Sequence, residues 1–395
     1  MIKTDTLVVG AGPQALTVVA RWVCDRPTAV DDVVVVDPAG CWMRAWDEQF
    51  EQQRIDVLRS PGVHHPDPDS MALLHAYRYR TTPTCQHCSP NGDPLNGPLR
   101  RPTTAAFADF CRDLAARTGL ARRVHPASIV DLHPIGTAAQ PMWCAELSDG
   151  AVLRARQVVW AGNPRRPNVP GGVELCTTIT HSNEVDLASA TPGQRIAVVG
   201  GGQTAGQLAL EAARAGADVA LISRGPRRTA NLDVDAGWLM DDHLTPFRAV
   251  ADPYERRRIA ELARQGSMTP DLHHALAHAS VRQMCSAGEI SASGNDDGAI
   301  VRVADVELHV DMVWVATGTT PDLHVDPVLA TRAAHGAPHL SGWPILDERL
   351  HWEPGLAVVG ALAALTIGPS AGNLGGARAA ADILGDHAPR PTRRP

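Results

Sequence analysis

Residues 6–15 read Thr6-Leu7-Val8-Val9-Gly10-Ala11-Gly12-Pro13-Gln14-Ala15, and they decide the fold of the chain. The first four predict a buried strand, and the apolar run at 16–20 predicts a helix. Strand, glycine turn and helix in this order form the context in which a Gly-x-Gly-x-x-Gly/Ala pattern predicts a dinucleotide site. Without that context the same pattern is only a glycine turn in an ordinary α/β unit.

Each position of this motif has a physical reason. Gly10 permits a tight turn, Gly12 lets a pyrophosphate approach the backbone, and Ala15 lets the helix pack close to the strand. The helix N-terminus offers free N–H groups to the phosphates. A second strand, 33–36, ends in Asp37, the acid expected to bind a ribose hydroxyl.

A second complete unit follows later in the chain. The strand at 194–199 leads into Gly200-Gly201-Gly202-Gln203-Thr204-Ala205 and then a helix to about residue 215. The next strand, 217–222, ends in Ser223-Arg224, with Arg227 and Arg228 close behind. A hydroxyl and an arginine at this position suit a 2′-phosphate, so NADPH is favoured over NADH. The alternative is that these arginines only solvate a surface loop.

Composition excludes several classes of protein. Of 395 residues, 44% are hydrophobic and 20% charged, which is a globular composition. The net charge of −7 and the absence of long basic blocks argue against nucleic acid as the main partner. No apolar run reaches the ~18 residues of a membrane span. A strand begins within about five residues of the start, so we expect no signal peptide, and a cytoplasmic protein with free thiols. The oligomeric state is open, and a homo-oligomer is compatible with the sequence.

The sequence contains two groups of metal-ligand residue types, but neither predicts a metal site. Cys85 and Cys88 lack a second pair for structural zinc, and they could instead form a redox pair or be neutral loop cysteines. His274 and His278 share a helical face with no obvious third ligand, which favours solvated surface histidines.

Other elements follow from periodicity and turn signals. We expect a short strand at 54–59, a helix at 103–118, a hairpin over 142–156 turning at Asp149-Gly150, and a further strand from 157. The small-residue segment Gly368 to Ala377 begins a helix, where a flavin ring could lie with its O2 edge facing free N–H groups.

The order of these motifs resembles the two-dinucleotide flavoproteins, and most closely the flavin-dependent N-hydroxylating monooxygenases, the ornithine and lysine N-hydroxylases. Four stretches carry the resemblance: residues 10–16, Gly40-Cys41-Trp42, residues 199–205 and Val315-Ala316-Thr317-Gly318. The chain departs from that family's pattern at Thr319, where the family has Tyr, and at 175–181, where only His181-Ser182 is kept. Asn231 is a faint candidate for the family's substrate-binding Asn stretch, so the substrate is left open.

The resemblance implies an α/β fold with two Rossmann-like domains, the NADPH domain being inserted into the FAD domain. The FAD domain would span 1–170 and 321–386, and the NADPH domain 190–320 with a helical insertion at about 229–285. Residues 387–395 would form a disordered tail.

The implied chemistry is that NADPH reduces FAD, and that one oxygen atom of the co-substrate O2 then passes to a soft nucleophile. The small-molecule substrate would be an amine or amino acid of siderophore or specialised-metabolite biosynthesis, with N-, C- or S-oxygenation left open. Candidate catalytic residues are Gln203 and, on a rigid loop that could face the flavin, Ser60, His64 and His65. The FAD-binding candidates are Gly10, Gly12, Pro13, Gln14, Ala15, Asp37, Trp42 and Asn373. The NADPH-binding candidates are Gly200, Gly202, Gln203, Thr204, Ser223 and Arg224.

Two other functions fit the same scaffold. A disulfide or quinone reductase without oxygen insertion would need an electron acceptor at the flavin, and Cys85 and Cys88 are the only cysteines at suitable spacing. A nucleotide-binding protein without turnover is the third.

Overall fold

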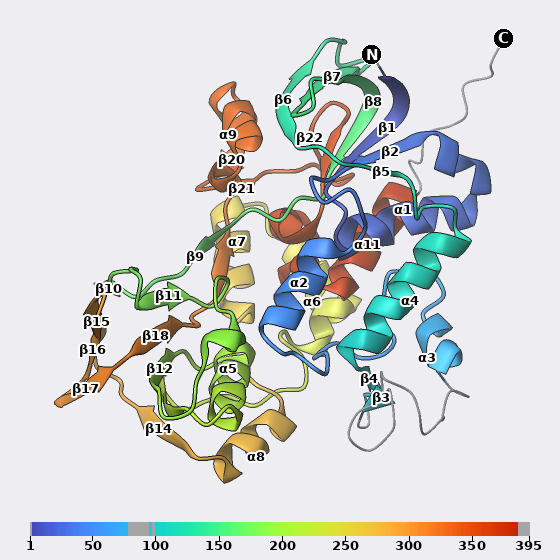
Figure 1. Cartoon of the computed structure of the whole chain (residues 1–395). Coiled ribbons are helices and arrows are strands. Elements are labelled where there is room, and N and C mark those ends of the chain that lie inside the picture. Colours follow the sequence, from blue (N-terminus) through green and yellow to red (C-terminus); the bar gives the residue numbers. More distant parts are fainter. Residues whose placement is uncertain (1, 78–94, 97–98, 386–395) are drawn as a thin grey trace.

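The computed structural model describes residues 2–77, 95–96 and 99–385 (Figure 1). Cys85, Cys88 and the tail 387–395 therefore lie outside the described residues. The chain forms two sheet-based units, and the first contains strands from both ends of the sequence.

The first sheet is built around β1 (Ile2–Val9), which lies between β2 (Val33–Val36) and β8 (Val152–Trp160) and is parallel to both. Its strand order is β22-β23-β8-β1-β2-β5. The flanking strands are β5 (Val124–His125), β22 (His351–Glu353) and β23 (Leu356–Val358). Because β23 pairs in parallel with β8, the C-terminal part of the chain completes the sheet that the N-terminus begins.

The expected hairpin is confirmed. It consists of β7 (Trp143–Leu147) and the first half of β8, and β6 (Ile129–Pro134) adds to it antiparallel. The separate strand expected from 157 is wrong, because β8 runs unbroken to Trp160 with β1 paired along most of its length.

Helices α1 (Pro13–Asp25) and α11 (Leu374–Gly385) pack together against this sheet, and α4 (Thr104–Arg117) contacts α1 (Figure 1). The indole N–H of Trp22, on α1, donates to the Leu384 carbonyl oxygen at 3.2 Å. The helix expected at 103–118 is confirmed as α4, and Thr103 caps it by accepting the Ala106 N–H. Two shorter helices are α2 (Arg44–Gln52) and α3 (Ala72–Tyr77).

The strand expected at 54–59 is wrong. Its alternating residues make only an isolated bridge between Val57 and Thr103. The neighbouring hairpin is formed instead by β3 (Leu95–Asn96) and β4 (Arg101–Pro102).

The second unit has a five-stranded parallel sheet in the order β11-β18-β12-β13-β14. These strands are β11 (Ile179–His181), β12 (Arg195–Val199), β13 (Asp218–Ser223), β14 (Val281–Cys285) and β18 (Met312–Val315). Successive strand residues point to opposite faces. Accordingly Ile196 and Val198 pack beneath α5 (Gln203–Arg214) and α8 (Pro270–His278), whereas Ala197 and Val199 face a second, four-stranded sheet.

The four-stranded sheet has the order β10-β15-β16-β17. Its strands are β10 (Gly172–Val173), β15 (Ile290–Asn295), β16 (Gly298–Val303) and β17 (Val306–Val310). The second unit is therefore a Rossmann-like sheet covered by helices on one side and by strands on the other.

Two linkers join the units and run side by side. The first contains β9 (Arg165–Pro167) and the second β19 (Thr319–Pro321), and these strands pair antiparallel. After the second linker come α9 (Pro327–Ala334), β20 (His339–Leu340), β21 (Trp343–Pro344) and α10 (Ala364–Ile367).

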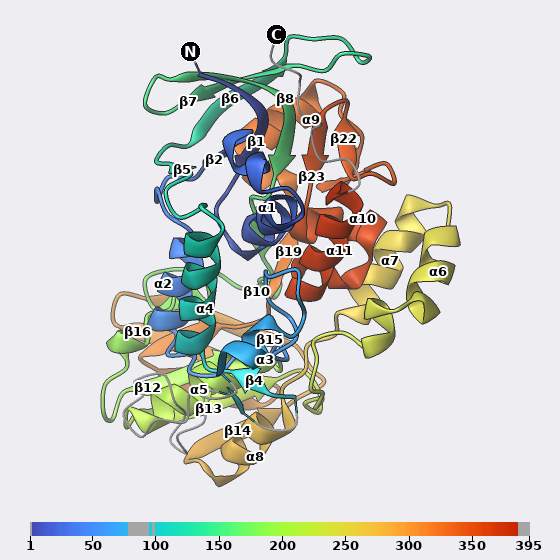
Figure 2. The same cartoon turned by 90° about the vertical axis from the view of Figure 1, so that its right-hand side faces the viewer.

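The helices of the segment 229–285 pack in two different places. Helix α8 covers α5 of the second unit. Helices α6 (Asp241–Ala249) and α7 (Pro253–Ala263) extend away from that sheet, and α7 contacts α10 and the turn Pro369–Gly372 of the first unit (Figure 2). The inserted segment therefore reaches back across the junction between the units.

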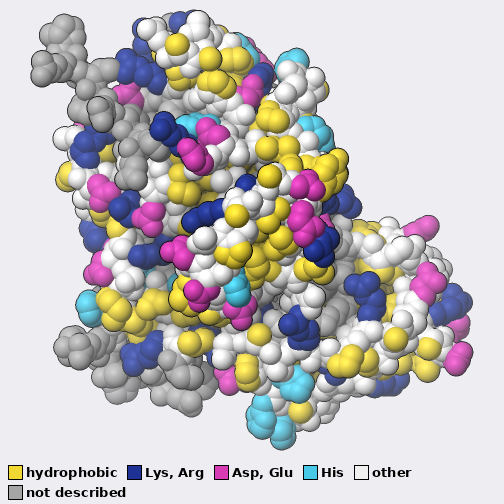
Figure 3. All heavy atoms as spheres, turned by 180° about the vertical axis from the view of Figure 1, so that it is seen from behind, with side chains coloured by type: hydrophobic (Ala, Val, Ile, Leu, Met, Phe, Trp, Pro, Cys, Tyr) yellow, Lys and Arg dark blue, Asp and Glu magenta, His cyan; other side chains and the backbone are white. Residues whose placement is uncertain are grey.

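The described helices include none that is both long and apolar enough to cross a membrane. On the face seen in Figure 3, Lys and Arg side chains lie among Asp and Glu side chains rather than in one large patch.

Candidate active site

The first glycine turn has the shape that a dinucleotide requires. Gly10 has φ +96°, and a Cβ there would lie 3.2 Å from the Gly162 nitrogen. Gly12 caps α1, and within the described structure a Cβ at Gly12 would meet no atom inside 4 Å. The space beside Gly12, at the N-terminus of α1, is therefore open for a phosphate. Pro13 begins the helix with the φ that suits this position, and Ala15 is fully buried against the sheet.

Asp37 supports the same turn. It follows β2 directly, and its Oδ2 accepts the Ala11 N–H at 2.9 Å. Its Oδ1 accepts the Ala39 N–H at 2.9 Å. A carboxylate offers about four lone-pair positions, so Asp37 can hold the turn and still accept a ribose hydroxyl.

The C-terminal segment closes over the start of α1. Gln14 Nε2 donates to the Asn373 carbonyl oxygen at 3.1 Å, and Asn373 Oδ1 accepts the Gly376 N–H at 3.0 Å at the start of α11. Gln14 Oε1 is buried and has no hydrogen-bond partner among the described residues. Buried polar atoms are nearly always paired, so this acceptor suits a donor on a bound cofactor.

Trp42 lies on the inner side of this unit. Its ring is buried, and its indole N–H donates to the Leu120 carbonyl oxygen at 2.9 Å. The only polar atom of the Trp42 side chain is therefore already hydrogen-bonded within the protein.

The second glycine turn is more tightly constrained than the first. A Cβ at Gly200 would lie 2.3 Å from the Ala316 carbonyl oxygen, so no other residue fits there. Gly202 caps α5, and Gln203 Oε1 accepts the Thr269 N–H at 2.9 Å, which holds the segment around Thr269 against the turn. A cleft of about 620 Å³ begins at this turn; its walls include residues 200–204, Ser223, Arg224 and Arg227, the linker residues 317–320, and Arg165 and Arg264.

At the end of β13, the Ser223 side chain contacts Arg227 rather than Arg224. The Ser223 hydroxyl is buried, donates to the Gly225 carbonyl oxygen at 2.9 Å and accepts from Arg227 Nη1 at 3.2 Å. Arg224 is exposed at the rim of the same cleft. Arg227 Nε is buried and has no partner among the described residues, so this guanidinium retains a free donor.

The loop that carries Ser60, His64 and His65 separates these three residues. His65 is fully buried, packs edge-on against Phe110 and has Nε2 3.1 Å from the Ser70 carbonyl oxygen. Burial lowers the pKa of His65 to about 4, so it is neutral near pH 7. His64 is partly buried, and burial followed by the nearby Arg378 lowers its pKa, opposed by Asp233. Ser60 is also partly buried.

His181, at the end of β11, contacts the start of the second linker. It is fully buried, its Nδ1 accepts the Asn183 N–H at 3.3 Å, and its Nε2–H donates to the Gly318 carbonyl oxygen at 3.1 Å. His181 therefore forms a structural bridge between β11 and the second linker.

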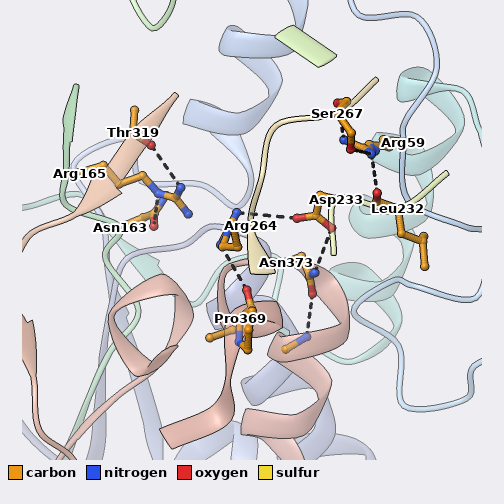
Figure 4. Close-up of polar contacts among 12 residues, drawn as sticks. Arg59, Asn163, Arg165, Leu232, Asp233, Arg264, Ser267, Thr319, Pro369 and Asn373 are labelled. Atoms are coloured by element: carbon orange, nitrogen blue, oxygen red, sulfur yellow. Dashed lines mark hydrogen bonds and ion pairs between the residues drawn. The ribbon is translucent and has the colours of Figure 1, made fainter. Parts of the chain in front are cut away.

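Three arginines at the junction of the units were missed from the sequence (Figure 4). Arg165, on β9, donates to Asn163 Oδ1 at 2.9 Å and to Thr319 Oγ1 at 3.3 Å. Arg264, just after α7, lies with Nη2 3.7 Å from Asp233 Oδ2, and Asp233 Oδ1 accepts from Asn373 Nδ2 at 3.4 Å.

The third is Arg59, which clamps the second unit to the first. Its guanidinium donates to the carbonyl oxygens of Ala230 and Ser267, each at 3.0 Å, and to Ser267 Oγ at 2.7 Å. It also donates to the carbonyl oxygens of Leu232 and, at 3.4 Å, Asn231. The candidate Asn231 is itself exposed, on the wall of a smaller neighbouring cleft.

His274 and His278 lie on the exposed face of α8 with ring centroids 4.3 Å apart. Within the described ranges, no group of three His, Cys, Asp or Glu side chains is arranged to hold a metal ion.

Comparisons with known proteins agree with this architecture. The family described as pyridine nucleotide-disulphide oxidoreductase matches residues 147–338. No curated protein sequence matches the chain. Among solved structures, ornithine N-hydroxylase from Kutzneria sp. 744, with reduced FAD, NADP+ and L-ornithine, is 16% identical, with 98% of this chain and 99% of that chain covered and a TM-score of 0.75.

Two further structures show how widely this fold is used. L-lysine 6-monooxygenase from Pseudomonas syringae is 17% identical, with 98% and 99% of the two chains covered and a TM-score of 0.72. Bacillithiol disulfide reductase from Staphylococcus aureus is 13% identical, with 98% of each chain covered and a TM-score of 0.62. The resemblance inferred from the glycine motifs is thus confirmed at the level of fold: over nearly its whole length, this chain is folded like the flavin-dependent N-hydroxylating monooxygenases.

Proposed function

We propose that this chain is a cytoplasmic NADPH- and FAD-dependent monooxygenase acting on a small molecule. The overall reaction would be substrate + O2 + NADPH + H+ → oxygenated substrate + NADP+ + H2O. The observation that carries the proposal is the pair of complete strand–glycine–helix units. The second glycine turn opens into a cleft, and this cleft extends to Ala361 and Ala364 in the C-terminal part of the first unit.

FAD fits the first unit. Gly10, Gly12, Pro13 and Ala15 shape the turn and Asp37 follows β2, as a site for the adenosine diphosphate half requires. Gln14, with its unpaired Oε1, and Asn373 belong to the part of the site nearest α11. When bound, FAD supplies hydride acceptance and the activation of O2, chemistry that no side chain can supply.

NADPH fits the second unit. The N-terminus of α5, at Gly200, Gly202, Gln203 and Thr204, would bind the diphosphate. Ser223, Arg224 and Arg227 would bind the 2′-phosphate, because a hydroxyl and guanidinium groups complement its charge and oxygens. The nicotinamide half would then extend along the cleft toward Arg165, Arg264 and the C-terminal segment.

In this proposal the protein's own side chains hold the cofactors in place and take no direct part in the reaction. Neutral His65 and the Arg378 guanidinium, which donates to the Asp67 and Pro68 carbonyl oxygens at 2.8 Å, fix the loop beside the proposed flavin position. Arg59 holds Ser267, which follows Gly266 of the cleft wall, and the segment 230–232, which lines the smaller neighbouring cleft.

The proposed substrate is a soft nucleophile. The favoured substrate is an amine or amino acid of siderophore or specialised-metabolite biosynthesis, oxygenated at nitrogen. Support comes from the fold shared with the ornithine and lysine N-hydroxylases.

A disulfide reductase is the second candidate, because the bacillithiol disulfide reductases share the fold. Such an enzyme would use a thiol near the flavin. The six cysteines within the described ranges are all free, and Cys85 and Cys88 lie outside those ranges.

One experiment separates these functions. Purified holoprotein is reduced with NADPH under argon, and then exposed to O2 with a panel of amines, amino acids, thioethers and disulfides. A monooxygenase bleaches the flavin with NADPH and yields a product heavier by one oxygen in mass spectra. NADPH-dependent thiol release without oxygen incorporation would establish the reductase, and failure to bleach the flavin would remove both.

A further inference from the structure

Two guanidinium groups converge on one glycine of the C-terminal segment. A Cβ built on Gly372 would lie 3.0 Å from Arg165 Nη2 and 3.1 Å from Arg264 Nη1. Arg165 reaches this point from the first linker, and Arg264 from the end of α7 in the inserted segment (Figure 4). Gly372 directly precedes Asn373, the residue whose side chain accepts an N–H of α11 and whose carbonyl binds Gln14.

This convergence leaves an excess of positive charge. Arg165 bonds only to the neutral side chains of Asn163 and Thr319, and the described structure places no carboxylate within 4.0 Å of it. Arg264 donates to the Pro369 carbonyl oxygen at 3.4 Å and shares the single carboxylate of Asp233 at 3.7 Å. Two like charges beside one opposite charge, partly withdrawn from water, favour the binding of a further anion.

Burial, with the neighbouring Arg264 as a smaller cause, lowers the pKa of Arg165 to about 10. The Arg165 guanidinium is therefore still charged near pH 7, and a ligand anion would balance this charge.

We infer that Arg165 and Arg264 are the countercharge for the N1–C2=O edge of the reduced isoalloxazine ring. The inference rests on the proposed function. Hydride transfer breaks the nicotinamide C4–H bond, places the hydrogen and its electron pair at flavin N5, and leaves NADP+. The ring thereby gains one negative charge, which is centred on N1 and C2=O, and a positive group there favours reduction.

The location favours the flavin over the other anions of this cleft. The NADPH diphosphate has its own site at the N-terminus of α5, on the second sheet. Gly372 belongs instead to the segment that Gln14 ties to the first glycine turn. The two arginines are accordingly positioning residues that tune the flavin, and no bond is made or broken at either of them.

The test is the two-electron midpoint potential of the bound FAD, measured against reference dyes in holoprotein. Arg165→Gln and Arg264→Gln are each expected to lower the equilibrium constant for reduction about tenfold, which for two electrons is about 30 mV. Asp233→Asn removes the opposing charge and retains an oxygen for Asn373, so it is expected to raise the potential. A loss of packing would not produce shifts of opposite sign.

Arg258→Gln is the matched control. Arg258 lies on α7, the helix that ends just before Arg264, but its side chain is exposed and paired with Glu255. Its potential should equal that of the wild type. If both arginine variants keep the wild-type potential, the inference fails. It fails in the same way if the only effect of the variants is weaker binding of NADPH or of substrate. A wild-type protein that binds no FAD, or whose FAD NADPH does not reduce, would contradict the proposed function instead.

Discussion

At the scale of single residues, the preference for NADPH depends on which arginine meets the 2′-phosphate. The run Ser223-Arg224 indicates a phosphate site, but it cannot show which side chain turns inward. In the structure Arg227 contacts the Ser223 hydroxyl, and Arg224 is exposed at the rim. The nearer guanidinium, partly withdrawn from water, should contribute more to discrimination between the two nicotinamide cofactors.

Arg227→Ala is therefore expected to reduce the ratio of kcat/KM for NADPH to that for NADH by at least about tenfold, which corresponds to roughly 1.4 kcal/mol. Arg224→Ala should have a smaller effect on this ratio. Arg214→Ala, at the far end of α5 and paired with Glu211, should leave it unchanged. A larger effect at Arg224 than at Arg227 would reverse the assignment.

His65 gives a prediction about pH. In the folded protein its pKa is about 4, below the usual 6.5, because burial disfavours the charged ring. The unfolded chain therefore takes up a proton that the folded chain does not. The stabilisation is complete above about pH 6.5 and is lost as the pH falls from there toward 4, by at most roughly 3 kcal/mol.

His65→Gln keeps a donor for the Ser70 carbonyl oxygen but has no titrating ring. Its free energy of unfolding, measured with urea at several pH values, should fall less steeply than that of the wild type between pH 6.5 and 4.5. Equal slopes for the two proteins would show that His65 does not carry this dependence.

At the scale of elements, the relative position of the two units depends on a few long side chains. Arg59 is the clearest case, because its donors bind carbonyl oxygens on two separate segments, 230–232 and 267. Gln53 adds a buried hydrogen bond from Nε2 to the Ser182 carbonyl oxygen at 2.7 Å. Among the acceptors of Arg59 only Ser267 is buried, and a buried carbonyl left without a donor costs about 1–3 kcal/mol, so loss of Arg59 should loosen residue 267 and the segment 230–232.

Arg59→Met keeps the aliphatic length and removes every donor. We expect faster amide hydrogen exchange in residues 228–236 and a several-fold higher KM for NADPH, with FAD content unchanged. Arg44→Met, an exposed ion-pair variant on α2 of the same unit, serves as the control. Unchanged exchange at 228–236 in Arg59→Met would mean that the clamp does not hold this segment.

Elements that are specified by local sequence patterns could be predicted from the sequence. The side-chain contacts at the junction between the two units could not. Both glycine turns were found because each turn, strand and helix is specified within about ten neighbouring residues. The strand expected at 54–59 is not formed, because alternation shows only that a segment could pair. Its pairing is limited to one bridge, Val57 with Thr103, beside which the Leu58 N–H donates to the Pro102 carbonyl oxygen. Arg59, Arg165 and Arg264 acquire their roles from contacts between distant segments, for which single arginines in loops give no signal.

At the scale of the whole molecule, the two linkers and the inserted helices bring two nucleotide sites to a common junction. Linkers β9 and β19 pair with each other, and α7 packs on the C-terminal segment of the first unit. A cofactor held in the second unit would therefore extend toward one held in the first. This arrangement is what the proposed monooxygenase requires, and the fold shared with a disulfide reductase shows that fold alone does not decide the acceptor.

The most direct test of the central claim is the fate of molecular oxygen. Holoprotein is supplied with NADPH, isotopically labelled ¹⁸O₂ and the amine and amino acid panel, and the products are read by mass spectrometry. The account predicts one labelled oxygen atom in a substrate-derived product for each NADPH consumed. Consumption of NADPH with all of the label in hydrogen peroxide or water, and none in any product, would contradict it.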